Sequence, residues 1–523
     1  MVKYLDRNSG FNQWNAAKNA AGDGKKSWFG GFLGWFVIFL AAWWLAGYFM
    51  GPKKQMVTTD AAPTPVVDLS SVPVDEITSD KLSARVQGLR ISDIRLTDFA
   101  ATAGDTTGPR VSLLGGAGDY AEIGYVATGS AAPVATTVWR GAPDKMIWKS
   151  ANGLEFARTI TTDGYVISVS DTIKNNTKSD VAFAPYARIV RGNEHKSAAG
   201  VKTGAVAYVN SDVEYEDWRD MDKKSYAYST TNGFIGFADQ YWETIVSVDA
   251  ADQTMRLKFA DEKYHADAAA GAVQVPAGAV KTITTNIYAG PREQRALDAA
   301  SAQIAGINDT IDYGWFWFLA QPLLWILNML NALVHNYGVA IIILTLLLRF
   351  VMWPLTRKSY TSMMAMQKMQ PEMARIQKLY ANDKMRLQME MMRLYQTHKT
   401  SPMSGCLPML LQIPIFFALY KALLVSVQMR SAHFLWISDL AAMDPYFILP
   451  ILMGATMWLQ SRLQTTGQNS TANDAIAQTQ RVMKWMPVMF TVLFAWMPAG
   501  LVLYWTVSNL FGIAQMYIIK KRS

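Results

Sequence analysis

The chain has 523 residues, of which 51% are hydrophobic and only 17% are charged, and its formal net charge is +8. Soluble domains carry about 25% charged residues, so this composition argues against a wholly soluble protein and indicates an integral membrane protein with a substantial water-exposed part. The single cysteine, Cys406, excludes an internal disulfide framework and a multi-cysteine metal site. Excess Lys and Arg in a membrane protein is typical of cytoplasmic loops. We therefore expect no DNA partner, no metal and no other cofactor.

The N-terminal part contains one long apolar stretch. Residues 1–27 are polar and predict a cytoplasmic tail, whereas residues 28–49 are long enough to form transmembrane helix 1. A signal peptide is the alternative for 28–49. However, the stretch is longer and more aromatic than a usual signal sequence, and residues 47–50 make a poor cleavage site. We predict an uncleaved anchor, followed by a proline-rich linker over residues 50–85.

Residues 86–290 change to an alternating apolar and polar pattern. Stretches such as 165–171 and 280–287 read as strands separated by turn signals, without interleaved helices. This predicts a large antiparallel all-β sandwich domain. Two polar aromatic stretches, 214–218 and 239–242, would either line a carbohydrate cleft or form a polar and aromatic sheet surface. We favour the sheet surface.

Residues 291–337 predict a linker and an interfacial helix. The first part shows a helical pattern up to residue 312. The stretch 315–334 is apolar on all sides, but polar residues and Pro322 interrupt it. Its tryptophans suit the headgroup level, so we expect this helix to lie at the membrane surface rather than to cross it.

Five further apolar stretches are predicted to cross the membrane, which makes six transmembrane helices with the first anchor. Transmembrane helices 2 to 6 are predicted at residues 338–356, 406–425, 446–460, 485–498 and 501–519. The stretches 446–460 and 485–498 are shorter than the roughly 20 residues that a full crossing needs. We therefore expect a locally thinned bilayer around them.

The charges of the connecting loops predict the orientation. The loop 357–402 reads as a helical hairpin and holds nine basic residues against three acidic ones. The loop 461–484 and the tail 520–522 are also net basic. Because positively charged loops stay in the cytoplasm, both termini are predicted to be cytoplasmic and the β domain is predicted to lie outside.

The span 338–356 contains one arginine, Arg349, close to its cytoplasmic end. A charged side chain at the centre of a membrane helix costs about 2.5–3.5 kcal/mol on insertion scales. One explanation is that Arg349 reaches the cytoplasmic headgroups. The other is that it lines a water-filled cavity between helices. The five core spans contain no Asp or Glu, which argues against a proton-coupled transporter and a hydrolytic site.

Further polar residues in the spans favour a water-filled cavity over the explanation that Arg349 reaches the headgroups. They are Thr345 one turn from Arg349, Gln412 in the next span, and Thr506, Ser508 and Asn509 in the last. Taken singly, such residues more often form hydrogen bonds between helices. Together with the Arg349 charge they predict a water-filled cavity that accepts a negatively charged or polar substrate. Lys421 lies near the outer end of its span, and we expect its ammonium to reach the outer headgroups.

The hairpin 357–402 is rich in methionine. The candidate contact residues on it are Met363, Met366, Met369, Met373, Met385, Met389 and Met392. One interpretation is a packed helical seam whose basic side is solvated or binds lipid. The other is an adaptable surface for varied apolar segments, because methionine repacks readily around different partners.

Motifs over residues 335–519 carry a resemblance to a known family. They are Thr345-x3-Arg349-x4-Pro354-Leu355-Thr356, Tyr360-Thr361-Ser362-Met363, Gly405-Cys406-x-Pro408-x3-Gln412-x-Pro414-Ile415-Phe416, Leu435-Trp436-Ile437-x-Asp439-Leu440, Asp444-Pro445-Tyr446-x-Ile448-Leu449-Pro450-Ile451-Leu452-Met453-Gly454, and the run Pro498-Ala499-Gly500-Leu501-Val502-Leu503-Tyr504-Trp505-x-Val507-Ser508-Asn509. With the predicted topology, this region resembles the YidC/Oxa1/Alb3 family of membrane protein insertases. Residues 86–290 fit the periplasmic β-supersandwich of its bacterial members, which implies a Gram-negative inner membrane.

The resemblance implies a non-enzymatic insertase for nascent membrane proteins, acting alone or with the SecYEG translocon in the lipid bilayer. Arg349 would line a hydrophilic groove open to the cytoplasm and to lipid. Thr345, Gln412, Tyr504 and Trp505 would surround that groove or its entrance, with Ser508 and Asn509 beside them. Spans 406–425 and 485–498 would form an apolar slide.

The resemblance further implies that the hairpin makes the first contact with substrate, ribosome or targeting receptor. The polar extension at 1–27 and the four residues after Ile519 depart from familiar members, and the short tail does not favour ribosome binding through a long basic C-terminus. A different class of function stays open beside the insertase: a small-solute transporter or channel with an accessory periplasmic glycan-binding domain.

Overall fold

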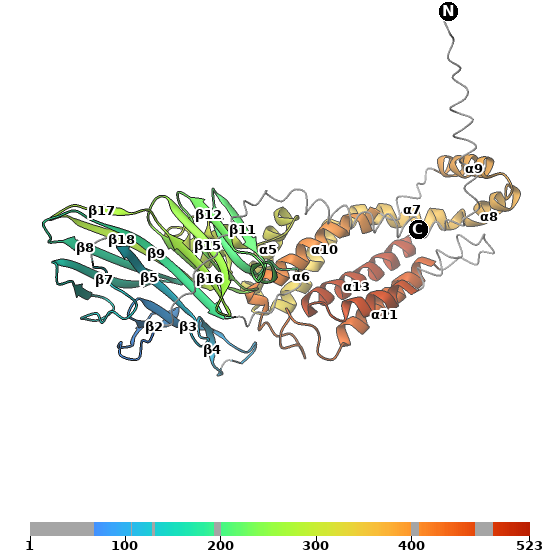
Figure 1. Cartoon of the computed structure of the whole chain (residues 1–523). Coiled ribbons are helices and arrows are strands. Elements are labelled where there is room, and N and C mark those ends of the chain that lie inside the picture. The colour runs from blue at the N-terminus through green and yellow to red at the C-terminus, as the bar shows by residue number, and fades with distance from the viewer. Residues whose placement is uncertain are drawn as a thin grey trace, which may run out of the picture.

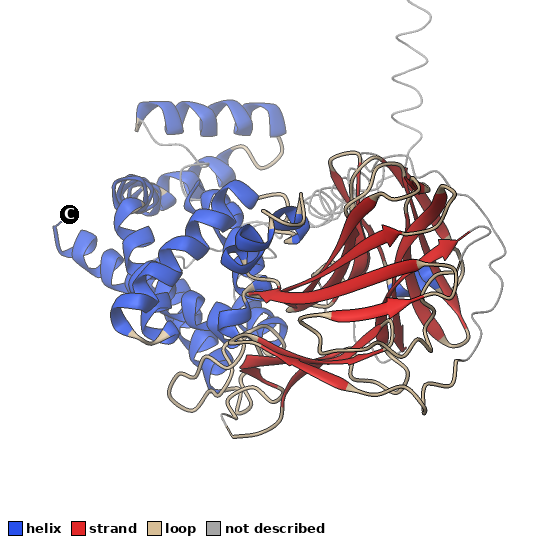
Figure 2. Ribbon diagram, turned by 90° about the vertical axis from the view of Figure 1, so that its left-hand side faces the viewer, coloured by secondary structure: helices blue, strands red, loops and turns tan. Residues whose placement is uncertain are grey.

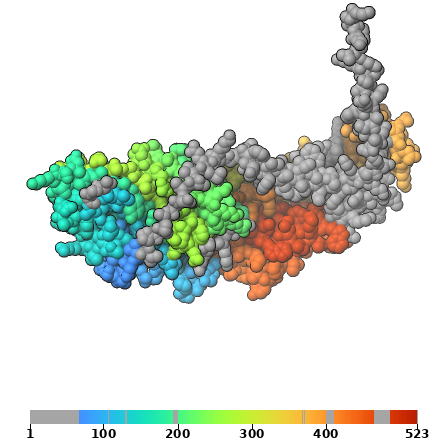
Figure 3. All heavy atoms as spheres, in the orientation of Figure 1, coloured from blue at the N-terminus to red at the C-terminus, as the bar shows by residue number. Residues whose placement is uncertain are grey.

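The computed structural model describes residues 67–105, 107–127, 131–192, 200–398, 407–465 and 485–522. The predicted cytoplasmic tail and transmembrane helix 1 lie outside the described residues, as does most of the predicted loop 461–484. The strands occupy one end of an elongated molecule and the helices occupy the other (Figure 1, Figure 3). The two regions predicted from the periodicity of the sequence are therefore spatially separate bodies.

The strands form two antiparallel sheets that lie in two layers (Figure 2). The first sheet has the order β1-β2-β3-β5-β9-β16-β15-β12, with β4 paired to β3 and β17 paired to β9. Its strands are β1 Asp75–Thr78, β2 Leu82–Gln87, β3 Arg90–Ala100, β4 Arg110–Leu113, β5 Tyr120–Ala127, β9 Val181–Gly192, β12 Tyr226–Thr230, β15 Gln253–Ala260, β16 Lys263–Ala269 and β17 Val273–Val275.

The second sheet has the order β11-β10-β13-β14-β18-β8-β7-β6. Its strands are β6 Met146–Lys149, β7 Leu154–Asp163, β8 Val166–Asn175, β10 Gly204–Val209, β11 Asp212–Glu216, β13 Phe234–Ala238, β14 Trp242–Val248 and β18 Val280–Pro291, and a short helix, α3 Trp218–Met221, follows β11. Long central strands such as β8 and β18 match the stretches predicted at 165–171 and 280–287.

The core of the β domain lies between the two sheets. From Val181 to Ile189 every second residue of β9 is buried, so Ala187 and Ile189 point inward while Tyr186 and Arg188 are less buried. They share one apolar cluster with Ile167 of β8 and Ile287 of β18, which belong to the opposite sheet. The two-residue period therefore gives each sheet one buried face, and the predicted all-β sandwich is confirmed.

The β domain begins earlier than the sequence predicts. Strand β1 pairs with β2, and both start inside the range 50–85 that is predicted to be linker. The short alternation around Ile77 buries that side chain in the sandwich core. A four-residue strand beside several prolines gives too little periodicity to be separated from a linker in the sequence.

The connection between the β domain and the helices is less helical than predicted. Helix α4 covers only Gln294–Ala300, and a short 3-10 helix, η1, covers Ile307–Thr310. The helix predicted to reach residue 312 is therefore wrong beyond Ala300. Between the two segments the backbone of Gly306 adopts a left-handed φ of 80°, which a helix cannot contain. The apolar residues of this connection are nevertheless buried, as the helical pattern suggested.

The helical part contains α5 Trp317–Val334, α6 Tyr337–Val351, α7 Trp353–Lys368, α8 Gln370–Leu379, α9 Lys384–Thr397, α10 Leu407–Val425, the 3-10 helix η3 Val427–Met429, α11 Ile448–Thr465, the helix Trp485–Phe494 and α13 Ala499–Arg522. By length and composition, α5 and α13 can cross a membrane, and the bent pair α6–α7 can make a third span. The six-span topology and the interfacial position of α5 stay predictions.

The predicted span 338–356 is broken in the structure. Helix α6 ends at Val351, and α7 leaves it at an angle of 63°. Pro354 lies in the first turn of α7, where its missing N–H removes no helical hydrogen bond. The predicted hairpin also contains an additional break: α7, α8 and α9 replace the two helices expected, because α8 restarts at Gln370 with Pro371 in its first turn. Helix α11 extends past the predicted end at residue 460.

One apolar core joins the β domain to the helices. It includes Val206, Phe234 and Ile245 from the second sheet, Leu297 and Ile307 from the connection, and Leu327, Leu344, Leu419, Leu501 and Leu503 from the helices. Two polar contacts support this junction. The Gln240 amide donates to the Leu424 carbonyl at 3.0 Å, and the Arg430 guanidinium donates to the Ala100 carbonyl at 2.9 Å.

Candidate substrate groove

Arg349 lies near the end of α6, one turn before the bend at Met352. Its side chain is half-buried, and its Nε donates to the Ser508 hydroxyl on α13 at 2.7 Å. None of the ion pairs between described residues includes Arg349. Its guanidinium therefore has further N–H donors available and carries a full positive charge inside the helical part. Its hydrogen-bond partner, the Ser508 hydroxyl, is neutral.

Gln412 and Tyr504 form a second polar contact next to Arg349. The Gln412 amide on α10 donates to the Tyr504 hydroxyl on α13. Tyr504 and Ser508 are one turn apart, lie on the same face of α13 and interact with each other. The structure thus brings together four of the predicted groove residues, Arg349, Gln412, Tyr504 and Ser508, which we call the polar cluster.

Three other predicted groove residues face elsewhere. Thr345 is fully buried, and its hydroxyl donates to the carbonyl of Ile341 in its own helix at 2.6 Å. The Asn509 amide faces α11, where Thr456 Oγ1 lies at 3.3 Å. Trp505 packs among aromatic rings, with the Phe494 ring at 5.1 Å. These orientations depend on how each helix is rotated in the bundle. They place the three residues in packing positions around the polar cluster, and their role at the groove stays a prediction.

Lys421 is paired, contrary to the prediction that it reaches the outer headgroups. Its ammonium lies 2.8 Å from a carboxylate oxygen of Asp312, in the connection that precedes α5. Burial acts to raise the pKa of Asp312, but the charge and hydrogen bond of Lys421 outweigh it and lower that pKa below its usual value. The pair ties the C-terminal half of α10 to the connection.

The methionines of the hairpin divide into two groups. Met369 is buried and Met363 packs against the cluster of Tyr360, Met516 and Ile519. Met366 and Met373 are half-buried. Only Met385, Met389 and Met392 are mostly exposed, and their spacing places them on one face of α9. In this conformation the Met369 side chain is inaccessible, whereas the α9 face is exposed, and the contact role of the hairpin methionines stays a prediction.

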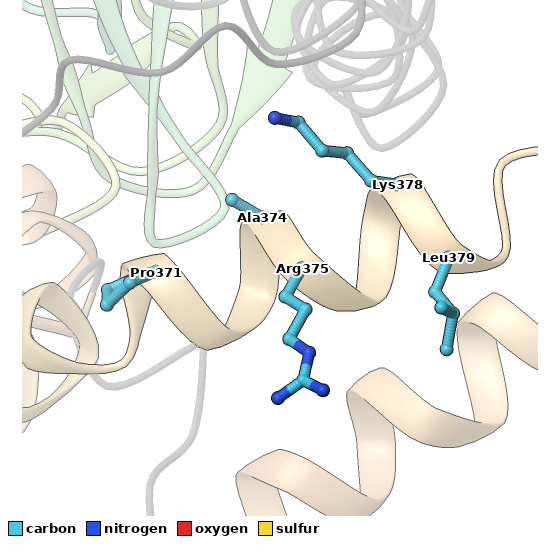
Figure 4. A pocket seen from close by; sticks show the side chains of 5 residues that line it. All are labelled: Pro371, Ala374, Arg375, Lys378 and Leu379. Carbon is cyan, nitrogen blue, oxygen red and sulfur yellow. The ribbon is translucent and has the colours of Figure 1, made fainter.

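A hollow of about 440 Å³ lies on α8, lined by Pro371, Ala374, Arg375, Lys378 and Leu379. Figure 4 shows Arg375 and Leu379 extending to one side of the helix, with Lys378 extending to the other. Leu379 is 68% exposed. The hairpin therefore presents basic and apolar groups together, as its sequence predicts.

The two polar aromatic stretches of the β domain do not line an open cleft. Trp218 is buried and stacks on Phe237, and Gln240 contacts the helices at the junction. Trp242 packs beside Phe99, where the Arg430 guanidinium lies 5.6 Å from its ring. Neither a cleft nor a plain sheet surface describes them, because several stabilise the contact between the β domain and the helical part.

A buried ion pair anchors the same junction. Arg292 Nε lies 3.5 Å from Glu243 Oε2, and both side chains are almost fully inaccessible. The Arg292 guanidinium also donates to the carbonyls of Asp239 and Thr310, and the Thr310 hydroxyl donates to Glu243 at 3.1 Å. Burial raises the pKa of Glu243 to about 7, although Arg292 and Thr310 act to lower it.

This raised pKa predicts a pH dependence of stability. Between about pH 4.5 and pH 7 the folded protein holds a proton on Glu243 that the unfolded chain has lost, so stability falls as pH rises. At about 1.4 kcal/mol per pKa unit, we expect a loss of about 2 kcal/mol between pH 5.5 and pH 8. Thermal unfolding followed by tryptophan fluorescence will measure it as a change in Tm.

Glu243→Gln is the control for that experiment. The amide keeps the shape of the side chain and cannot titrate, so the variant should lose the Glu243 part of the pH dependence while other groups titrate as before. An identical change of Tm with pH in the two proteins would contradict the assignment to Glu243.

Sequence reasoning gave no groove role to four polar groups that lie beyond Arg349 toward the C-terminal end of α13, although Thr356 and Tyr360 stand in the family motifs. The Gln515 amide on α13 donates to the Thr356 hydroxyl on α7 at 2.6 Å, and both residues are buried. The Tyr360 hydroxyl and the Gln460 amide lie near Gly512, which is on α13 between Ser508 and Gln515. The spacing of Tyr504, Ser508, Gly512 and Gln515 on one helical face is the signal that would have found them.

Among the described residues no group of three or more His, Cys, Asp or Glu side chains is placed to hold a metal ion. The polar cluster itself contains one guanidinium, two hydroxyls and one amide. Such a set binds anions and hydrogen-bonding groups and contains no general base at neutral pH. Its chemistry therefore suits recognition of a polar segment better than bond cleavage.

Comparison with known proteins identifies the family. Residues 329–523 match the family model described as 60Kd inner membrane protein, and residues 76–326 match the model of the YidC periplasmic domain. A membrane protein insertase YidC from Magnetococcus marinus is 37% identical over 427 residues, which cover 77% of this chain and 75% of the relative. The chain belongs to the YidC family of membrane protein insertases.

A second relative agrees with this assignment. The membrane protein insertase YidC of Mesorhizobium japonicum is 34% identical over 84% of this chain and 79% of the relative. A crystal structure of an active YidC insertase covers 85% of this chain and 94% of that chain, with 18% identity and a TM-score of 0.37. As a YidC family member, the chain is a bacterial inner-membrane protein with a periplasmic all-β domain and a helical membrane region.

Proposed function

We propose that the chain is a non-enzymatic insertase that moves the polar flank of a nascent membrane protein past Arg349 and releases the apolar part into lipid. The single observation that carries this proposal is the charge of Arg349 in the polar cluster, which has no acidic partner among the described residues. A half-buried guanidinium next to a neutral hydroxyl retains strong affinity for a carboxylate or a peptide carbonyl. Because the chain belongs to the YidC family, the expected substrate of this site is a nascent membrane protein.

The steps follow from elementary energetics. The charge of Arg349 attracts a polar or acidic flank into a groove around the polar cluster, open to the cytoplasm. The short spans thin the bilayer and reduce the distance that the flank must cross. The apolar part then leaves along α10 and the helix Trp485–Phe494, and its transfer into lipid drives the reaction.

Other parts of the chain supply the partners in this proposal. The exposed methionine face of α9 and the basic hollow on α8 make the first contact with the nascent chain, the ribosome or a targeting receptor. The protein works alone or beside the SecYEG translocon, with both termini in the cytoplasm and six spans. These assignments rest on the loop charges and on the family.

Reconstitution tests the proposed function. Purified protein in liposomes should insert a single-span substrate, so that its flank becomes protected from added protease, and empty liposomes should not. The same vesicles should show no substrate-dependent flux of small solutes. Solute flux without insertion would contradict the proposal and favour a transporter or channel.

A further inference from the structure

Gln515 carries an unsatisfied buried group beside the polar cluster. Its side chain is 1% exposed; the amide donates to Thr356, but Oε1 has no hydrogen-bond partner among the described residues. Leaving a buried acceptor unpaired costs about 1–3 kcal/mol. Native proteins pair most such atoms, so this oxygen requires an explanation.

Further polar groups lie one turn away on the same face of α13. At Gly512, one turn before Gln515, the neighbouring helices approach α13 closely, because a Cβ there would meet Gln460 Nε2 at 3.2 Å and the Tyr360 hydroxyl at 3.5 Å. The Tyr360 hydroxyl and the Gln460 amide thus both lie beside this part of α13. Three helices, α7, α11 and α13, thus direct amide or hydroxyl groups toward one place.

The distance along α13 from Ser508, the partner of Arg349, to Gln515 matches a short stretch of extended polypeptide. Seven residues of helix separate Ser508 from Gln515, which is about 10 Å along α13. An extended polypeptide covers that distance in about three residues. A segment held at Arg349 by one residue would therefore reach Gln515 with another residue of the same short stretch.

We propose that Gln515, Thr356, Tyr360 and Gln460 form a second subsite, centred on Gly512, that binds the main chain and uncharged polar side chains of the entering flank. This inference rests on the proposed insertase function and names a part of its substrate. A peptide N–H of the flank donates to Gln515 Oε1. Arg349 selects negative charge, whereas this subsite binds peptide groups whatever the flank charge.

The test compares two substrates that differ only in the translocated flank, one acidic and one rich in Ser and Asn. Gln515→Leu removes the acceptor and Thr356→Val removes the hydroxyl. Each should slow insertion of the Ser/Asn substrate about two- to tenfold, the effect of one hydrogen bond of about 0.5–1.5 kcal/mol. The loss should be smaller for the acidic substrate, which Arg349 also holds.

Thr361→Val is the matched control, because Thr361 is exposed on the same helix and its hydroxyl bonds only to carbonyls of that helix. It should insert both substrates like the wild type. The unfolding temperatures of all variants must stay within a few degrees of the wild type. Equal losses for both substrates, or no loss for the Ser/Asn substrate, would overturn the subsite.

Crosslinking gives a second readout that does not depend on the insertion rate. In a Cys406→Ser background, Thr356→Cys should form a disulfide with a cysteine in the flank of an arrested substrate, and Thr361→Cys should not. Failure of both positions, or equal crosslinking, contradicts the subsite. If Arg349→Ala leaves acidic flanks unaffected while Thr356→Cys crosslinks, the charge proposal fails and the subsite stands.

Discussion

Replacing Arg349 by alanine is expected to slow insertion of a substrate with an acidic translocated flank by about 10- to 100-fold. The substitution removes a charge-assisted hydrogen-bond donor, and such interactions contribute about 1.5–3 kcal/mol. A substrate with a neutral flank should lose less. Arg349→Lys keeps the charge but loses the planar fork that binds a carboxylate through two donors, so its rate should lie between those of the wild type and the alanine variant. Protease protection in reconstituted vesicles measures all these rates.

Arg462→Ala is the control for charge alone. Arg462 is exposed in the last turn of α11, where its guanidinium lies 4.9 Å from the Trp458 ring. Removing Arg462 lowers the net charge by as much as Arg349→Ala does. The insertion rate should nevertheless stay within about twofold of the wild-type rate. If Arg349→Ala inserts the acidic substrate at the wild-type rate, the charge in the polar cluster is not what recognises the flank.

The sequence predicted the features that depend on local pattern. Two-residue alternation identified the sandwich, and the lack of acidic residues in the spans made Arg349 stand out. The same reasoning failed where a partner lies far away in the chain. Lys421 looked like a residue that reaches the headgroups because Asp312, more than a hundred residues earlier, belongs to a connection with no membrane-like pattern.

Helix rotation is a second feature that sequence reasoning does not reach. Thr345 and Asn509 have the polar character expected of groove residues, but the packing of the bundle turns them to a carbonyl of their own helix and to α11. Gln515 shares a face of α13 with Ser508, and only the neighbouring helices reveal that its carbonyl oxygen lacks a partner among the described residues. Composition identifies candidate residues, whereas the contacts between helices decide which of them meet.

Arg292→Met should destabilise the protein by about 3–5 kcal/mol at pH 8, the loss seen when one partner of a buried ion pair is removed. Arg292 donates to backbone carbonyls from three segments and is the counter-charge of Glu243. Without it Glu243 must take up a proton or remain buried as an unpaired anion. The loss should therefore be smaller at pH 5.5, where a carboxyl with a pKa of about 7 is already neutral. Thermal unfolding at the two pH values measures the difference.

The double variant Arg292→Met/Glu243→Gln separates the charge from the packing. In a Glu243→Gln background, Arg292→Met should lower the free energy of unfolding by less than it does in the wild type. The remaining loss should not depend on pH, because it reflects only the backbone carbonyls left without a donor. Strictly additive losses would show that the two side chains do not interact. The β domain would then be held on the helices by the apolar core and the hydrogen bonds of Gln240 and Arg430, with no contribution from this ion pair.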